Sequence, residues 1–214
     1  MLEPLSMVHP AESLVEASIT IPHAILSGLL VVPDKSDPKE SGLGVEWLDE
    51  QHVVLLAAHR HLLVVHRISQ DSRPFASFFL PADLLRFRLK PLDRGVCRVR
   101  LQQAWVSIRG HSAPNRFPER LRHWRDLLAM EAGQEDGTPQ FDLTVLEKLR
   151  AARLLLTGDP RTRMRCRRDG PCIDVFHENA FAVVMRSEER SSFVLPEWAR
   201  TSTIEPLPKR ASLG

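Results

Sequence analysis

The hydrophobic pattern of the chain consists mostly of short segments in which apolar and polar residues alternate. This period of two is typical of half-buried β-strands. It is clearest in residues 96–101 (Val-Cys-Arg-Val-Arg-Leu) and in 161–167, where four arginines share one face. Because an exposed sheet face is normally polar, both stretches predict strands with a solvated charged side. Other runs rich in β-forming residues predict strands at 44–48, 52–58, 61–68, 104–109, 173–176 and 180–185.

Three helix starts divide these strands into repeated units. Residues 19–26 and 78–85 both read as an apolar strand, a proline and an apolar helical face, and proline is favoured in the first helical turn. A third start follows, with Asp142 as a candidate N-cap. Pro22 and Pro81 are 59 residues apart, and Asp142 lies 61 residues after Pro81. This regular spacing predicts a repeated unit of strand, helix and antiparallel strands.

The repeats predict the domain organisation. We expect an α+β protein of about three half-domain units, with the helices on one face of the sheets. The apolar spacing of Leu121, Trp124, Leu127 and Leu128 predicts a further helix. The predicted division is a domain over 18–130 with units 18–70 and 75–130, a linker at 131–140, a third unit at 141–186 and a C-terminal tail at 187–214.

Composition narrows the class of protein. The chain is 43% hydrophobic and 26% charged, and no apolar run approaches the ~18 residues of a membrane span. The N-terminus lacks the pattern of a secretory signal. Three cysteines are an odd number, which argues against a disulfide framework. We therefore expect a globular protein of the cytoplasm that does not cross a membrane.

The charges are unevenly distributed. The net charge is only +2, but of the 29 basic residues five are lysines, which leaves 24 arginines. Arginine binds phosphate bidentately, so this bias is compatible with nucleic-acid contact; a GC-rich genome explains it equally well. Acidic residues gather in connecting segments such as 34–40 and 131–136, whereas arginines fall inside the predicted strands.

The motifs of common enzyme classes are absent from the sequence. There is no nucleophile elbow, zinc-protease helix, phosphate-binding loop or dinucleotide fingerprint. We therefore expect neither enzymatic activity nor a cofactor. A metal site is a rival interpretation, because His59, His61 and His66 lie close together. Zinc sites usually add a second ligand cluster at defined spacing, and Cys166 and Cys172 do not have it, so we expect no metal.

Several local segments together carry a resemblance to a known family. They are Gly44-Val-Glu-Trp47, Leu55-Leu-Ala-Ala-His-Arg-His-Leu-Leu-Val-Val65, Arg116-Phe-Pro-Glu-Arg-Leu-Arg122, Phe141 to Leu149, Gly170-Pro-Cys-Ile173 and Ala180-Phe-Ala-Val-Val-Met-Arg186. In this order, over roughly residues 18–186, they resemble the bacterial DNA sliding clamp, the β processivity subunit of the replicative polymerase. The chain departs from that family at His59-Arg60-His61-Leu62, where the family has Asp-Gly-His-Arg, and after Met185, where the family's proline is missing.

The resemblance implies a ring on double-stranded DNA. A sliding ring holds phosphates without reading bases, since base contacts would pin it in place. Three units per chain, against twelve in a family ring, imply a homo-oligomer of four chains. The resemblance further implies a basic lining from the second and third helices. The candidates for this lining are Arg86, Arg88, Lys90, Lys148, Arg150 and Arg153.

The resemblance also implies a pocket for a short hydrophobic peptide of a DNA polymerase or repair protein. A groove with a flexible methionine suits several related peptides. One wall is expected from Arg60, His61, Leu62 and Leu63, and the other from Val183 and Met185. Plain core packing is the alternative for the apolar members of this set. The departures from the family fit a second hypothesis, a clamp-derived interaction module that does not encircle DNA, and the shortened chain suggests a phage or plasmid origin.

Overall fold

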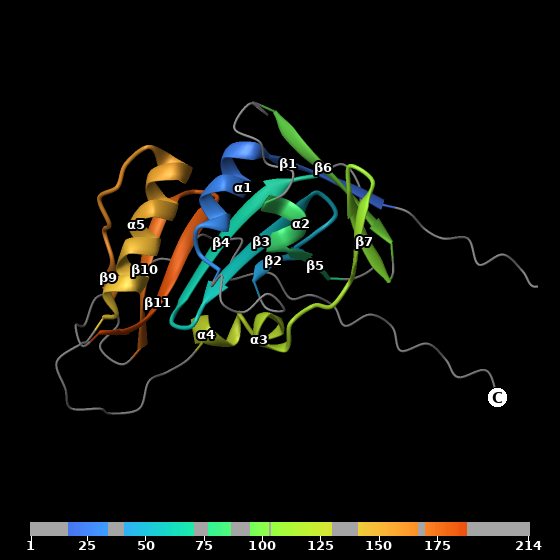
Figure 1. Cartoon of the computed structure of the whole chain (residues 1–214). Coiled ribbons are helices and arrows are strands. Elements are labelled where there is room, and N and C mark those ends of the chain that lie inside the picture. The colour runs from blue at the N-terminus through green and yellow to red at the C-terminus, as the bar shows by residue number, and fades with distance from the viewer. Residues whose placement is uncertain are drawn as a thin grey trace, which may run out of the picture.

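The computed structural model describes residues 17–33, 41–70, 77–86, 95–102, 104–129, 141–166 and 170–187. Its elements form two antiparallel sheets and five helices within these residues (Figure 1). The strands are β1 (Ala17–Pro22), β2 (Gly42–Trp47), β3 (His52–His59), β4 (Leu62–Ser69), β5 (Phe78–Pro81), β6 (Val96–Gln102), β7 (Trp105–Ile108), β8 (His111–Pro114), β9 (Arg165–Cys166), β10 (Gly170–His177) and β11 (Ala180–Ser187). The helices are α1 (His23–Leu30), α2 (Ala82–Arg86), α3 (Glu119–Arg122), α4 (Asp126–Ala129) and α5 (Leu143–Thr157).

The first two units exchange their first strands. β1 pairs with β6 and so completes the four-stranded sheet β1-β6-β7-β8 of the second unit. In return, β5 pairs with β2 at the edge of the sheet of the first unit. Each unit therefore depends on the other for a strand, so neither closes its sheet alone. This reciprocal pairing accounts for the regular repetition in the sequence.

The third unit extends the sheet of the first. β11 pairs with β4 over Ala180 to Val184, which joins β5-β2-β3-β4 to β11-β10-β9 in one seven-stranded sheet. The helices of the same two units also meet, because α5 packs along α1 (Figure 1). The predicted division at 131–140 falls outside the described residues, and the division into domains stays a prediction.

Between the helices and the sheets lies the larger hydrophobic core. It takes Leu26 and Leu29 from α1, Val145 and Leu149 from α5, and the inward residues of both sheets. Gly28 lets the two helices approach closely, because a Cβ there would lie 2.6 Å from Leu156 Cγ. The predicted placement of helices on one face of the sheets holds for α1, α2 and α5.

A second, smaller core lies on the opposite face of the seven-stranded sheet. The short helices α3 and α4 cover that face with Leu121, Trp124 and Leu128. The sequence predicted one continuous helix here, but a turn at residues 123–125 divides it. The two pieces keep the apolar spacing of a helix on either side of the turn, since Leu121, Trp124 and Leu128 are all buried.

Most predicted strands are confirmed, with two differences. β8 was missed, because His-Ser-Ala-Pro has little apolar content; β9 is only two residues long where 162–167 was expected. The second helix is described only to Arg86, and its predicted continuation lies outside the described residues. Cys172 is disulfide-bonded, contrary to the expectation from cysteine number, and Cys166 is opposite it in the sheet register. None of the described helices has the length and apolar content that crossing a membrane requires.

Candidate functional site

The backbone brings together the two predicted walls of the peptide pocket. Leu63 is opposite Val183 in the register of β4 and β11, and the Met185 N–H donates to the His61 carbonyl at 3.0 Å. Arg60, with φ of 31°, forms the turn between β3 and β4. The predicted residues therefore meet at one end of the β4–β11 pair.

The strands divide these residues between two faces of the sheet. Leu63 and Val183 belong to the smaller core under α3 and α4, whereas Leu62 belongs to the larger core beneath the helices. Side chains alternate along a strand, so Leu62 cannot share a wall with its neighbour Leu63. His61 is exposed and Met185 is half-buried. The structure thus corrects the predicted wall by removing Leu62.

A buried carboxylate anchors the cover of this face. Glu46 of β2 accepts hydrogen bonds from Trp124 Nε1 at 2.8 Å and from Arg125 Nη1 at 2.9 Å. The Arg125 guanidinium carbon lies 4.3 Å from the centroid of the Trp124 ring. Trp124 is fully buried. These contacts fix the turn between α3 and α4 to β2. Leu63 and Val183 are themselves only 4% and 1% exposed, so the chain itself already covers them.

Sequence reasoning missed the role of Glu46. The signal was present, because a lone acidic residue stands inside the apolar strand Gly-Val-Glu-Trp. A carboxylate in such a strand either faces solvent or is buried in the core. A buried carboxylate needs hydrogen-bond donors from elsewhere in the chain. Two of the segments that carried the family resemblance meet here, since Gly44 also packs beneath Phe117 and Leu121.

The N-terminus of α5 lies beside the Arg60 turn. The Asp142 carboxylate caps the helix by accepting from the Thr144 N–H at 2.8 Å, which confirms the predicted N-cap. That hydrogen bond is the main cause that lowers the pKa of Asp142, and the charges of Arg60 and His59 lower it further. Positive charge at the turn is thus held next to the helix end.

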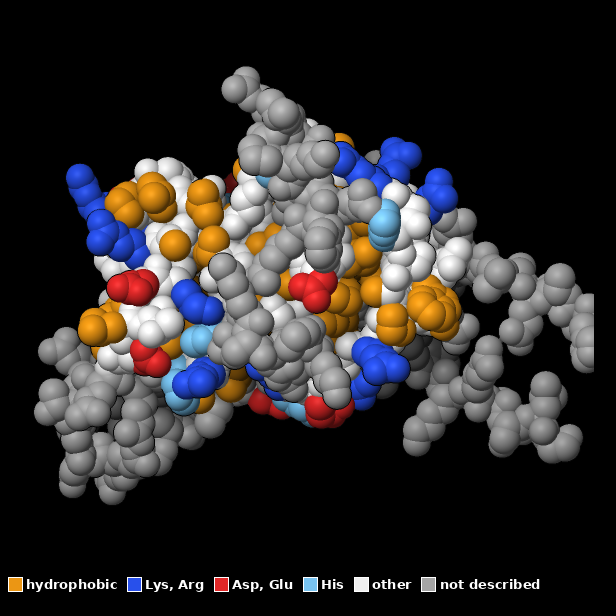
Figure 2. All heavy atoms as spheres, viewed as in Figure 1, with side chains coloured by type: hydrophobic (Ala, Val, Ile, Leu, Met, Phe, Trp, Pro, Cys, Tyr) orange, Lys and Arg blue, Asp and Glu red, His pale blue; other side chains and the backbone are white. Residues whose placement is uncertain are grey.

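The predicted DNA-lining residues of α5 do not form a basic stripe. Lys148 Nζ donates to the carbonyls of Val32 at 2.8 Å and Pro33 at 3.3 Å, which ties α5 to the end of α1. Arg150 is exposed. The remaining exposed surface of the helix is a mixture, because Glu147 is also exposed and Figure 2 shows orange side chains beside red ones over α5. Its exposed apolar residues are Leu143, Leu154 and Leu155.

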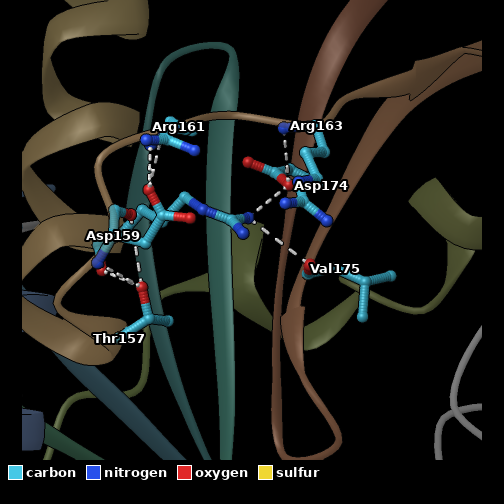
Figure 3. Close-up of polar contacts among 7 residues, drawn as sticks. Thr157, Asp159, Arg161, Arg163, Asp174 and Val175 are labelled. Carbon is cyan, nitrogen blue, oxygen red and sulfur yellow. Dashed lines mark hydrogen bonds and ion pairs between the residues drawn. The ribbon is translucent and has the colours of Figure 1, made fainter.

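Arg153 is buried and does not face solvent. Its Nη1 donates to Asp174 Oδ1 at 2.6 Å and to the Val175 carbonyl at 3.4 Å. The backbone N–H of Arg163 donates to the same carboxylate oxygen at 3.2 Å (Figure 3). Burial raises the pKa of Asp174, while the Arg153 charge opposes this shift. Arg153 therefore joins α5 to β10, and its assignment to a DNA lining is wrong.

Three other lining candidates lie at or beyond the end of α2. Arg86 is the last residue of that helix, and nothing of its side chain is described. Arg88 and Lys90 lie outside the described residues. Helix α1 contains neither lysine nor arginine. Of the predicted lining residues whose side chains the structure describes, Arg150 is therefore the exposed one.

The histidines of the rival metal interpretation do not gather into a site. No cluster of three potential ligands occurs among the described residues. His66 Nδ1 lies 2.9 Å from the Arg67 carbonyl, and its ring meets His177 edge-on at 5.3 Å between centroids. Burial is the main cause that lowers the pKa of His66 to about 4, and His177 lowers it further. His66 is therefore a neutral core residue near pH 7.

The fold of the chain is similar to that of solved sliding clamps. Neither a protein-family model nor the sequence of a curated protein matches the chain. The DNA polymerase sliding clamp of Caulobacter crescentus matches with a TM-score of 0.55 and 15% identity, over 83% of this chain and 67% of that one. The DNA polymerase III β subunit of Thermotoga maritima matches with a TM-score of 0.53 and 13% identity, over 83% and 66%. The clamp of Bacillus subtilis matches with a TM-score of 0.51 and 10% identity, over 81% and 64%.

The alignments span about two thirds of the length of these clamps. The identities are low, so the evidence for the likeness is the arrangement of strands and helices. The α+β architecture and the antiparallel sheets both match what the sequence resemblance implied. On these grounds, the chain has the sliding-clamp fold.

Proposed function

We propose that the chain is a non-enzymatic processivity factor of DNA replication. In this proposal, several copies form a ring in the cytoplasm that encircles duplex DNA without reading its sequence. The ring tethers a DNA polymerase or a repair protein through a short hydrophobic peptide. The sliding-clamp fold supports a processivity factor as the class of protein. The single observation that carries the proposal is the junction of β4 with β11.

The junction has the mixed character that a peptide pocket needs. Half-buried Met185 lies next to exposed His61, because the Met185 N–H donates to the His61 carbonyl. Leu63 and Val183 beside them are buried within the smaller core and support the strands from below, so the accessible surface here is that of His61 and Met185. A flexible thioether at the rim of an apolar surface can adapt to different side chains. We therefore propose that a peptide docks over His61 and Met185 and extends toward the Arg60 turn.

Peptide binding tests this pocket directly. A fluorescein-labelled hydrophobic pentapeptide should bind the full chain, and fluorescence anisotropy measures the affinity. Met185→Glu should weaken binding about tenfold or more, because a carboxylate would be desolvated against the peptide. Val175→Glu is the matched control, since Val175 is an exposed apolar residue on the neighbouring strand β10. Equal effects of the two substitutions would remove the pocket from this junction.

Ring formation requires separate experiments. Light scattering after size exclusion should give the mass of a closed oligomer, with four chains expected from three units per chain. The oligomer should stay on nicked circular DNA and leave after linearisation. Association should fall steeply with salt, because phosphate contacts release counterions. Arg150→Glu should weaken association with DNA. A monomer at working concentrations would argue against the ring.

A clamp-derived interaction module is the second candidate function, and one observation favours it. The surface where α1 and α5 meet contributes few available cations, because Arg153 is buried and Lys148 is bound to backbone carbonyls. Such a module would bind the peptide as a monomer and show no dependence on DNA topology. The peptide and ring experiments together therefore separate the two candidates.

A further inference from the structure

The segment that leads from α5 to β9 has an arginine at every second position. Arg161, Arg163 and Arg165 are all exposed, whereas Met164 packs against the larger core. Figure 2 shows blue side chains at the upper left, where Figure 1 draws this segment. Neither the expected ring lining nor the peptide pocket uses these three arginines, which we call the arginine row.

Main-chain hydrogen bonds hold the arginine row in place. The Arg161 N–H donates to Asp159 Oδ1 at 3.0 Å, and the Arg163 N–H donates to Asp174 Oδ1 at 3.2 Å (Figure 3). Arg165 is fixed by the pairing of β9 with β10. The position of the row therefore depends on its backbone and not on the guanidinium groups.

The carboxylates near the arginine row do not neutralise it. Asp174 is fully buried; burial raises its pKa, and the charge of Arg163 is one of the causes that oppose this rise. Asp159 Oδ1 lies 4.0 Å from Nε of Arg161, whose side chain is 83% exposed, and such an exposed pair is weak. Residues 160–166 contain no aspartate or glutamate. The row therefore keeps a net positive charge at the surface.

The arginine row lies apart from the helix surface. Opposite residues of antiparallel strands share a face, and Ile173, which is opposite Arg165, belongs to the smaller core. Helix α5 packs on the other face of the sheet, where Val145 and Leu149 join the larger core. β9 is the last strand of the seven-stranded sheet in the part of the chain that the structure describes. A ligand of the row would therefore run along this sheet edge and not across α1 and α5.

The spacing of the row suits a series of phosphates better than one small anion. In an extended segment, alternate residues are roughly 7 Å apart, so the three guanidinium groups reach separate anions. Each guanidinium can bind a phosphate bidentately. Proteins that bind single strands stack the bases on aromatic side chains, and residues 158–166 contain no aromatic residue. The segment therefore favours duplex over single-stranded nucleic acid.

We propose that the arginine row binds the phosphate backbone of duplex DNA along the edge of the seven-stranded sheet. The inference rests on the proposed function for the choice of DNA as the nucleic acid, but it requires neither ring closure nor the peptide pocket. The contact reads no bases, so it is independent of sequence. It supplies a basic surface that α5 lacks, because Arg153 is buried and Lys148 binds backbone carbonyls.

The test measures binding of a fluorescein-labelled linear duplex of about 20 base pairs to the full chain, by fluorescence anisotropy across a series of salt concentrations. The triple variant Arg161→Gln/Arg163→Gln/Arg165→Gln should reduce the slope of log affinity against log salt by about 2.7, since each phosphate contact on B-form DNA contributes about 0.9. The corresponding triple lysine variant should keep the slope but lose part of the affinity, because an ammonium group cannot bind phosphate bidentately.

A matched control removes the same charge elsewhere. Arg98→Gln/Arg116→Gln/Arg122→Gln replaces three exposed arginines outside the row and should leave the slope nearly unchanged. Both glutamine variants should melt like the unaltered chain, as followed by circular dichroism, because the hydrogen bonds that anchor the row come from the backbone.

Several results would overturn the proposal. They are no binding of the duplex by the unaltered chain, an unchanged slope in the row variant, equal slope losses in the two glutamine variants, and equal or tighter binding of a single strand or a polyglutamate peptide. Retention of the unaltered chain on nicked circular DNA tests the proposed function separately. A reduced slope without retention on circles would support the arginine row and reject the ring, whereas retention with an unchanged slope would reject the row alone.

Discussion

Arg153 of α5 and Asp174 of β10 form a buried ion pair, with 2.6 Å between Nη1 and Oδ1. Asp174 is fully buried and Arg153 is 5% exposed. The guanidinium also lies over the ring of Phe176, at 5.3 Å from its centroid. The pair therefore fixes the helix of the third unit to its own strands, and thereby fixes the position of α5 relative to the extended sheet.

We predict that Arg153 and Asp174 each stabilise the fold only while the other is present. Arg153→Met or Asp174→Leu alone should lower the free energy of unfolding by about 3–5 kcal/mol, because each removes one partner of a buried pair. The double variant Arg153→Met/Asp174→Leu should recover most of this loss, since it removes both buried charges. Urea denaturation of the four proteins measures the coupling. Additive losses would show that the pair acts as two independent residues.

A second prediction concerns the contact between α1 and α5. Gly28→Val should destabilise the chain by about 1–3 kcal/mol, as overpacking does in cores, because its Cβ would lie 2.6 Å from Leu156 Cγ and 2.7 Å from Leu156 Cδ2. Ala24→Val is the matched control, since Ala24 is exposed on the same helix. It should change the free energy of unfolding much less. Thermal melts followed by circular dichroism distinguish the two outcomes.

Local sequence patterns predicted most of the secondary structure and one cap. Asp142 caps α5 as expected, and the alternation in 96–101 gave the correct faces of β6. These features depend on residues close in the chain, so their periodicity carries the information. The pairing of β4 with β11 connects residues more than 110 positions apart, and only the family resemblance pointed to it.

The side-chain roles were predicted less well, for physical reasons. Arg153 immediately follows the buried Ala152 on α5, and nothing local shows that it meets a carboxylate 21 residues later. Basic residues on an amphipathic helix are usually solvated, so burial was the exception. The same limit applies to Glu46, whose donors Trp124 and Arg125 come from another part of the chain. Long-range polar pairs leave little periodic signal in a sequence.

A third prediction tests the anchor of α3 and α4. Trp124→Phe should lower the free energy of unfolding by about 1–3 kcal/mol, because the Glu46 carboxylate loses a buried hydrogen-bond donor. Trp105→Phe is the same substitution at an exposed site and should have little effect. Urea denaturation gives both values. Equal losses would indicate that the Nε1 bond at 2.8 Å contributes nothing to stability.

The last prediction is a fall in stability in mild acid caused by His66. In the folded chain its pKa is lowered from 6.5 to about 4, chiefly by burial. Above pH 6.5 the His66 ring is mostly neutral in both the folded and the unfolded chain, so it does not change the free energy of unfolding with pH there. Between pH 6.5 and 4 the unfolded chain takes up the proton first, and the free energy of unfolding should fall by about 3 kcal/mol. Urea midpoints across this range measure the fall.

His66→Asn is the control for this effect, because its amide can still donate to the Arg67 carbonyl that His66 Nδ1 meets. The variant cannot take up the proton, so its stability should decline less between pH 6.5 and 4. The His177 pKa is also lowered, again mainly by burial, and this residue should therefore cause a smaller decline of the same sign in both proteins. If the two pH profiles are parallel, the acid sensitivity comes from groups other than His66.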